Sequence, residues 1–263
     1  MIDPALAVTF DFDLFIDRLG NGESVFWEAL FTTVYISVIS EVLGIALGLA
    51  TFAMQRSRLL PVRVVAYAYA LVFRGTPIIV QIFFVFFGAN LLLGFDLFPQ
   101  SVEFLGLGVS GAVLAGITAL ALNEGAYMSE IVRAGIDSVD KGQMEAALST
   151  GMTRRLAMRR IILPQAARVI VPPLGNQFNY MLKTTALLAF IGVYELFRDA
   201  QVVYSRNFQP VEVFAGVAVW YFVLTTGWTL MQVQIERKLG ASERDEGEGW
   251  ITKILGIQAR SRA

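Results

Sequence analysis

Long apolar runs separated by short polar segments dominate this chain. Apolar runs of 18 or more residues with few charges are typical of helices that cross a membrane. We therefore expect an all-α fold, a polytopic membrane protein with five transmembrane helices. The five predicted spans cover approximately residues 24–54, 62–93, 110–134, 164–197 and 211–235.

Two of these spans are too long for one straight helix. The span 62–93 would measure about 48 Å, whereas the hydrocarbon core is about 30 Å thick. The sequence predicts a break at Arg74-Gly75-Thr76-Pro77, with a new helix starting at Pro77, because Thr is a good N-cap and Pro is favoured at the first helical position. In the span 164–197, Pro172-Pro173 and Lys183-Thr184-Thr185 predict interruptions.

Basic residues are distributed unevenly over the connections. Most Lys and Arg lie near Arg56, in the central loop 137–164 and in the C-terminal tail, whereas the connections 94–109 and 198–210 hold few. Because short loops rich in Lys and Arg stay in the cytoplasm, we predict an outside N-terminus and a cytoplasmic C-terminus. The predicted division is an extracytoplasmic lead-in over 1–23, a membrane domain over 24–239 and a cytoplasmic tail over 240–263.

Composition agrees with a membrane protein and excludes several chemistries. Of the 263 residues, 56% are hydrophobic and 16% charged, well below the charged share of about 25% in soluble domains. The chain has no Cys and no His, which excludes disulfides, thiolate chemistry, imidazole bases and the commonest zinc sites. The acidic segment 1–23 lacks the basic start of a signal peptide, so none is expected.

The central loop is predicted to form two short helices. Residues 143–150 can make about two turns, and Gly151 suits a position of positive φ just after them. Thr153 can cap a second helix over 154–162, and Pro164 begins the next span. This layout fits docking to a partner, but basic residues alone also fit a membrane anchor, and the residues by themselves leave both open.

A motif in this loop favours docking. It reads E-A-A, three residues, Gly, nine residues, then I-x-L-P, and it resembles the EAA signature of the permease subunits of type I ABC importers. The resemblance implies that the loop forms coupling helices, which seat in a groove of the ATP-binding subunit. The positions that carry it, and are expected to couple to that subunit, are Glu145, Ala146, Ala147, Gly151, Ile161, Leu163 and Pro164.

The flanking sequence resembles one branch of these permeases, the polar amino acid (histidine, glutamine, arginine, glutamate) permeases. The resemblance covers about residues 32–239, and its motifs are Arg74-Gly75-Thr76-Pro77 with Gln81, Gly125-Ala126-Tyr127, and Ser138 to Gln143. It implies a multi-pass permease subunit in a bacterial cytoplasmic membrane, which moves a polar amino acid into the cell. Many relatives read Lys-Asp-Thr-Ser-Leu where this chain has Lys183-Thr184-Thr185-Ala186-Leu187.

The resemblance also implies partners. These are an ABC ATP-binding subunit, a second permease subunit (identical or homologous), an extracytoplasmic solute-binding protein and the amino acid; nucleic acid is not expected. A P-loop needs Gly-Lys before Ser or Thr. No Lys of this chain follows a Gly. We therefore expect no enzyme activity, metal site or cofactor in this chain, with ATP and Mg²⁺ bound by the partner ATPase.

Polar groups at membrane depth are the candidate substrate pathway, because charges there are costly and face a cavity or a partner. Helix N-termini at the two breaks would suit an α-carboxylate, Asn123 and Glu124 an ammonium group, and Gln81 or Asn179 a polar side chain. The plainer interpretation of each is a hydrogen bond or ion pair within the bundle. The tentative pathway residues are Arg74, Thr76, Gln81, Asn123, Glu124, Tyr127, Asn179, Lys183 and Thr184.

The main alternative is an ion-driven secondary amino acid transporter. That class predicts inverted repeats with two matched broken helices. The two breaks predicted here share no sequence, and five spans do not divide into equal halves. The sequence therefore favours an importer subunit.

Overall fold

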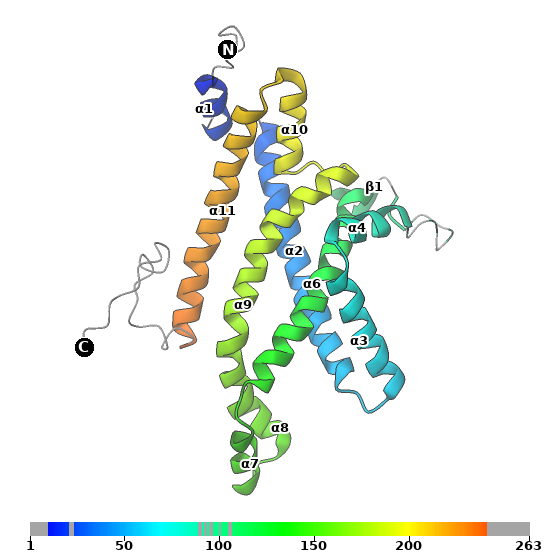
Figure 1. Ribbon diagram of the computed structural model, residues 1–263, viewed down its shortest axis with the longest axis vertical. Helices are drawn as coiled ribbons and strands as arrows, with labels where there is room; N and C mark the ends of the chain where they lie inside the picture. The colour runs from blue at the N-terminus through cyan, green and yellow to red at the C-terminus, as the bar shows by residue number, and fades with distance from the viewer. Residues whose placement is uncertain are drawn as a thin grey trace, which may run out of the picture. The chain divides into compact units, whose positions relative to one another are not determined.

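Helices form most of the computed structural model, which describes residues 10–20, 24–88, 91, 94, 97–99, 101–104 and 107–240. The predominantly helical architecture is thereby confirmed (Figure 1). The α-helices are α1 Phe12–Gly20, α2 Ser24–Gln55, α3 Leu60–Gly75, α4 Ile78–Phe83, α6 Gly111–Asp137, α7 Lys141–Ser149, α8 Arg154–Ala157, α9 Leu163–Thr184, α10 Leu196–Asn207 and α11 Pro210–Lys238. Helical segments of other pitch follow α4, α8 and α9: the π-helices Phe84–Gly88 and Met158–Ile162 and the 3₁₀-helix Thr185–Ile191.

A short β-ribbon departs from the all-α prediction. Strand β1 (Ser101–Phe104) pairs antiparallel with β2 (Leu107–Ser110), with Ser101 opposite Ser110. Each strand has only four residues, too few for alternation to identify a strand reliably in a sequence. The ribbon lies in the predicted connection before α6.

Two helices and two bent helix pairs are long and apolar enough to cross a membrane. Among the described residues, Val25–Gln55 and Pro210–Lys238 qualify alone, and each bent pair would add one span. The pairs are Leu60–Gly75 with Ile78–Gly88, and Arg154–Ile191 with Leu196–Asn207. Helix α6, the third predicted span, is not among them and carries Asn123 and Glu124 at its middle.

The predicted break between α3 and α4 is present, with a bend of 113°. Helix α4 begins at Ile78 and not at Pro77, and the Thr76 side chain does not cap it. Thr76 is extended (φ −119°, ψ 148°), as expected of a residue before proline, and its hydroxyl donates back to the carbonyl of Val72 (2.9 Å).

The interruption predicted at Pro172-Pro173 is wrong, and at Lys183-Thr184-Thr185 the helix changes its pitch without a break. Helix α9 continues through Pro172 and Pro173 and passes at Thr184 into the 3₁₀-helix, so the predicted helix N-terminus at Lys183-Thr184 does not exist. The Thr184 and Thr185 hydroxyls donate to carbonyls of their own helix, those of Tyr180 and Leu182, which leaves the helix intact there. The bend, of 50°, falls later, between Ile191 and Leu196.

A buried carboxylate, at the end of the predicted span 164–197, caps α10, and this helix occupies most of the predicted connection 198–210. Glu195 is fully buried and accepts from the backbone N–H groups of Phe197 (2.9 Å) and Arg198 (2.7 Å). It also accepts from the Tyr221 hydroxyl (3.0 Å), and the Leu196 N–H donates to Thr33 Oγ1 (3.1 Å). Helix α10 is thus fixed to α2 and α11, as Figure 1 shows for α2.

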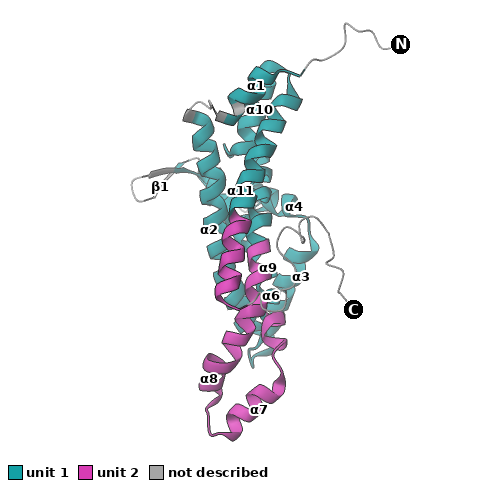
Figure 2. Ribbon diagram, turned by 90° about the vertical axis from the view of Figure 1, so that its left-hand side faces the viewer, with its two compact units in different colours: residues 1–132, 177–227 teal, residues 133–176, 228–263 magenta. Residues whose placement is uncertain are grey.

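The chain divides into two compact units, coloured separately in Figure 2. Unit 1 comprises residues 1–132 and 177–227, and unit 2 residues 133–176 and 228–263. In unit 1, glycines allow α2 to approach α6 closely: a Cβ at Gly44 would lie 2.6 Å from Cβ of Glu124. In unit 2, Gly135 and Gly175 likewise adjoin Ile170 and Gln232. The predicted tail 240–263 lies outside the described residues apart from Gly240.

Candidate functional site

The α3–α4 break in unit 1 is held by the side chain of Gln81, which is 7% exposed. Its Nε2 donates to the carbonyls of Phe73 (2.8 Å) and Thr76 (3.0 Å) and lies 2.8 Å from Thr76 Oγ1. The carbonyls at the end of α3 have lost their helical partners. Gln81 therefore replaces the hydrogen bonds that the break removes.

Asn123 of α6 completes this network. Its Nδ2 donates to the Phe73 carbonyl (3.1 Å) and to Gln81 Oε1 (3.0 Å), and the side chain is buried. Of the predicted pathway residues, the structure thus brings Thr76, Gln81 and Asn123 together. Both amides hydrogen-bond within the protein, which is the plainer of the two interpretations considered for them.

Arg74 lies beside this network, in the last turn of α3. Its Nη1 is 3.5 Å from Glu130 Oε2, and its Cζ lies 5.9 Å from the ring centroid of Tyr127. The Arg74 side chain remains 43% exposed, and Tyr127 is 37% exposed. These three residues, Arg74, Tyr127 and Glu130, therefore form one polar cluster. The side chains of Arg74 and Tyr127 leave part of it exposed.

Glu124 is enclosed in unit 1, at 1% exposure. Gln177, which no sequence pattern singled out, donates its Nε2 to both carboxylate oxygens at 3.3 Å each. Glu41, three residues before Gly44 on α2, is also buried, and its oxygens have no hydrogen-bond partner among the described residues. The carboxylate of Glu124 thus contributes to helix packing in this state.

The candidates Lys183 and Thr184 do not join the network at the α3–α4 break. None of the hydrogen bonds described at the α3–α4 break involves Lys183 or Thr184, and Thr184 donates to Tyr180 instead. Lys183 is exposed and Asn179 half-buried. The described residues include no cluster of three or more acidic side chains that could hold a metal ion.

The central loop, in unit 2, has the helix–Gly–helix layout expected from its sequence. Asp140 caps α7 by accepting from the Gly142 N–H (2.7 Å), and Thr153 caps α8 by accepting from the Leu156 N–H (3.3 Å). Gly151 has φ +85°. The N–H groups of Gly151 and Met152 donate to Leu148 and Ala147, which is the Schellman ending of a helix.

The surface of this loop is mixed. Glu145 and Ala146 are exposed, and Ala147 is buried. Gly151, Leu163 and Pro164 are exposed as well, and Ile161 is half-buried. Leu148 and Leu156 add exposed apolar area. The exposed surface of the two short helices thus combines small, apolar and charged side chains.

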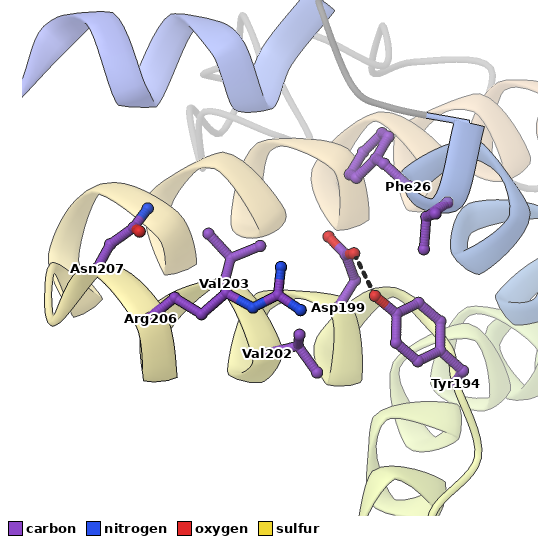
Figure 3. A pocket seen from close by; sticks show the side chains of 8 residues that line it. Phe26, Tyr194, Asp199, Val202, Val203, Arg206 and Asn207 are labelled. Atoms are coloured by element: carbon purple, nitrogen blue, oxygen red, sulfur yellow. Dashed lines mark hydrogen bonds between the residues drawn. The ribbon is translucent and has the colours of Figure 1, made fainter.

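A pocket of about 370 Å³ lies beside α10. Figure 3 shows the Tyr194 hydroxyl donating to Asp199 Oδ1 (2.8 Å). No sequence motif pointed to this pocket, because its walls come from α2, from α10 and from Tyr194 just before α10, far apart in the chain. The lining residues are Val25, Phe26, Tyr194, Asp199, Val202, Val203, Arg206 and Asn207.

Comparisons with known proteins agree on the nature of the chain. The family model for binding-protein-dependent transport system inner membrane components matches residues 42–241. The arginine transport system permease protein ArgU of Corynebacterium glutamicum is 39% identical over 211 residues, covering 80% of this chain and 66% of that protein. The L-cystine transport system permease protein TcyB of Bacillus subtilis is 38% identical over 222 residues, covering 81% of this chain and 88% of that protein.

A solved structure shares the fold. The crystal structure of an amino acid ABC transporter with histidines matches with a TM-score of 0.75 and 35% identity, covering 88% of this chain and 99% of that chain. These findings confirm the resemblance based on the EAA motif and do not favour a secondary transporter. ATP hydrolysis in this family belongs to a separate subunit. The chain is a member of the binding-protein-dependent transport system inner membrane components, the membrane-spanning permease subunits of ABC importers.

Proposed function

We propose that this permease subunit carries a polar amino acid into the cytoplasm of a bacterium. The observation that supports this most is the similarity, at 38–39% identity, to permeases named for arginine and cystine transport. Both amino acids carry an α-carboxylate and an α-ammonium beside a polar side chain. The transported molecule is accordingly an amino acid with a zwitterionic backbone and a polar or charged side chain.

The proposed topology has five spans in the cytoplasmic membrane, with the N-terminus outside and the C-terminus inside. The spans correspond to α2, the α3–α4 pair, α6, α9 with the 3₁₀-helix that follows it, and α11. Residues 1–23 form the extracytoplasmic lead-in, residues 24–239 the permease domain and residues 240–263 a cytoplasmic tail. The basic loops, including 137–164, then lie in the cytoplasm.

Coupling to ATP hydrolysis is assigned to the loop 137–164. In this proposal α7 and α8 seat on the ATP-binding subunit, which binds ATP and Mg²⁺, and Gly151 fixes the angle between the two helices through its positive φ. The coupling residues are Glu145, Ala146, Ala147, Gly151, Ile161, Leu163 and Pro164. A second permease subunit and an extracytoplasmic solute-binding protein complete the importer.

The substrate pathway is assigned to polar groups at membrane depth. The cluster of Arg74, Tyr127 and Glu130 is its most exposed part, and Lys183 adds an exposed charge. Thr76, Gln81 and Asn123 support the break beside this cluster. Glu124, Asn179 and Thr184 complete the set of pathway residues.

Co-purification tests this function directly. The tagged chain, expressed from its own host with its native neighbours and solubilised in mild detergent, is expected to retain an ATP-binding subunit. ATP hydrolysis by the reconstituted complex is expected to rise with the binding protein and one of the polar amino acids. Purification of the chain without an ATPase, together with ion-driven uptake in proteoliposomes, would show a secondary transporter instead.

A further inference from the structure

Arg74 has an unusual position for a charged side chain. It lies 14 residues after Leu60, the first residue of α3, and at 1.5 Å per residue this places it about 21 Å along the helix from the basic loop. A hydrocarbon core is about 30 Å thick, so the proposed topology puts Arg74 at membrane depth. A guanidinium exposed to lipid there is costly, so we expect the 43% of the side chain left open to face a polar space.

The contacts of Arg74 orient its guanidinium without using all of its donors. The 3.5 Å separation from Glu130 is longer than the 2.7–2.9 Å typical of a charge-assisted hydrogen bond. The Tyr127 ring supports the guanidinium from a second direction on α6. A guanidinium has five N–H donors in a planar fork, so donors remain for a further acceptor.

The backbone that follows Arg74 is open. A Cβ added to Gly75 would meet no atom within 4 Å, and Thr76 is exposed as well. The amides of Gln81 and Asn123, the other strong donors described at the break, already bond to the protein. The Arg74 guanidinium therefore supplies the exposed positive charge beside the α3–α4 break.

We propose that Arg74 binds the α-carboxylate of the transported amino acid, with Glu130 and Tyr127 holding the guanidinium in position and Glu130 facing the α-ammonium. The guanidinium fork matches the two oxygens of a carboxylate. An Arg–Glu pair and the backbone charges of an amino acid are both neutral overall, so binding adds no net charge at membrane depth. This assignment rests on the proposed function and gives one residue of the pathway a specific task.

The test compares amino acids with amines that lack only their α-carboxylates, of which arginine has one and cystine two. L-arginine and agmatine, and L-cystine and cystamine, are titrated into the purified permease–ATPase complex without its binding protein. The wild-type complex is expected to bind at least one amino acid about tenfold or more tightly than its amine, the size of one or two hydrogen bonds to a charged group. In Arg74→Gln this preference is expected to disappear, with binding of the amine unchanged.

A matched control is Arg133→Gln. Arg133 is 44% exposed and lies 3.5 Å from Asp137, almost the same values as for Arg74 and Glu130, and this variant is expected to keep the preference. Arg74→Lys keeps the charge without the fork and is expected to lose part of the preference. An equal loss of amino acid and amine in Arg74→Gln, or an unchanged preference, overturns the assignment.

Two further outcomes separate this assignment from the proposed function. Failure of both Arg74 variants to assemble with the ATPase would place Arg74 at a subunit interface and overturn the assignment. Absence of binding in the wild-type complex, while the same amino acids still stimulate ATP hydrolysis through the binding protein, would overturn the assignment alone. Absence of that stimulation for every polar amino acid contradicts the proposed function itself.

Discussion

Proline acts differently in the two units of this permease. In unit 1, Pro77 lies at the bend of 113° between α3 and α4. In unit 2, Pro172 and Pro173 lie inside the unbroken helix α9. Each proline removes a backbone N–H and disfavours helix in the residue before it. The different outcomes show that proline alone does not decide whether a helix ends.

The side chains that donate to helix carbonyls at the two proline sites come from different elements. At the break, Gln81 and Asn123 donate to the freed carbonyls, so a helix end inside the protein is not left unsatisfied. Along α9, two side chains of α11 donate to helix carbonyls: Trp228 to Gly175 (2.8 Å) and Gln232 to Pro172 (3.2 Å). Helix α11 is thus hydrogen-bonded to α9 close to the two prolines.

The largest effect is expected from removing the support of the break. Gln81→Leu deletes the donors to Phe73 and Thr76 and the acceptor for Asn123, leaving buried polar groups without partners. The expected loss is about 3 kcal/mol of stability, measured as a lower Tm of the detergent-solubilised complex. The control Gln201→Leu alters a partly exposed side chain that contacts Arg198 and should stay within about 0.5 kcal/mol. Equal Tm values for the two variants would mean that Gln81 does not hold the break.

A smaller effect is expected from separating α9 and α11. The methyl group of Gly175→Ala would overlap the side chain of Gln232, which is only 7% exposed and has little room to move. Overpacking of this kind costs about 1–3 kcal/mol, again measured by Tm. The matched variant Gly227→Ala, where a Cβ meets nothing within 4 Å, should be neutral or slightly stabilising. A Gly175→Ala protein as stable as Gly227→Ala would contradict the close packing.

The smallest effect is expected from a single hydrogen bond. Trp228→Phe keeps a ring against α9 but loses the N–H that donates to Gly175, at an expected cost of about 1 kcal/mol. Trp27→Phe, at a Trp that is 43% exposed, is the control and should change the Tm little. A larger loss in the Trp27 variant would show that ring size, and not the hydrogen bond, determines the difference.

The comparison of the two proline sites also shows which features of the fold could be predicted from the sequence: those that depend on residues close together in the chain. The capping of α8 by Thr153 and the positive φ of Gly151 follow from residues within one or two turns, and the expectations for them are confirmed. The bend at Pro77 was also visible locally. The continuity of α9 was not visible locally, and the side chains of α11 that donate to its carbonyls, Trp228 and Gln232, lie more than fifty positions away.

The candidate site shows the same limit. Membrane-depth polar residues could be named from the sequence, but their pairing could not: Asn123 meets Gln81 across 42 positions, and Gln177 meets Glu124 across 53. The capping of α10 by Glu195 was missed because Glu is not a favoured N-cap. The roles of the coupling and pathway residues remain predictions.

ATP hydrolysis by the assembled importer tests the central proposal, that the loop 137–164 couples this permease to its ATPase. Gly151→Val places a β-branched residue at φ +85°, which such residues rarely adopt, and so changes the angle between α7 and α8. With normal insertion, amino-acid-stimulated hydrolysis in proteoliposomes is expected to fall about tenfold or more, while Gly227→Ala retains it. Stimulation in Gly151→Val equal to that of the wild type would contradict coupling through this loop.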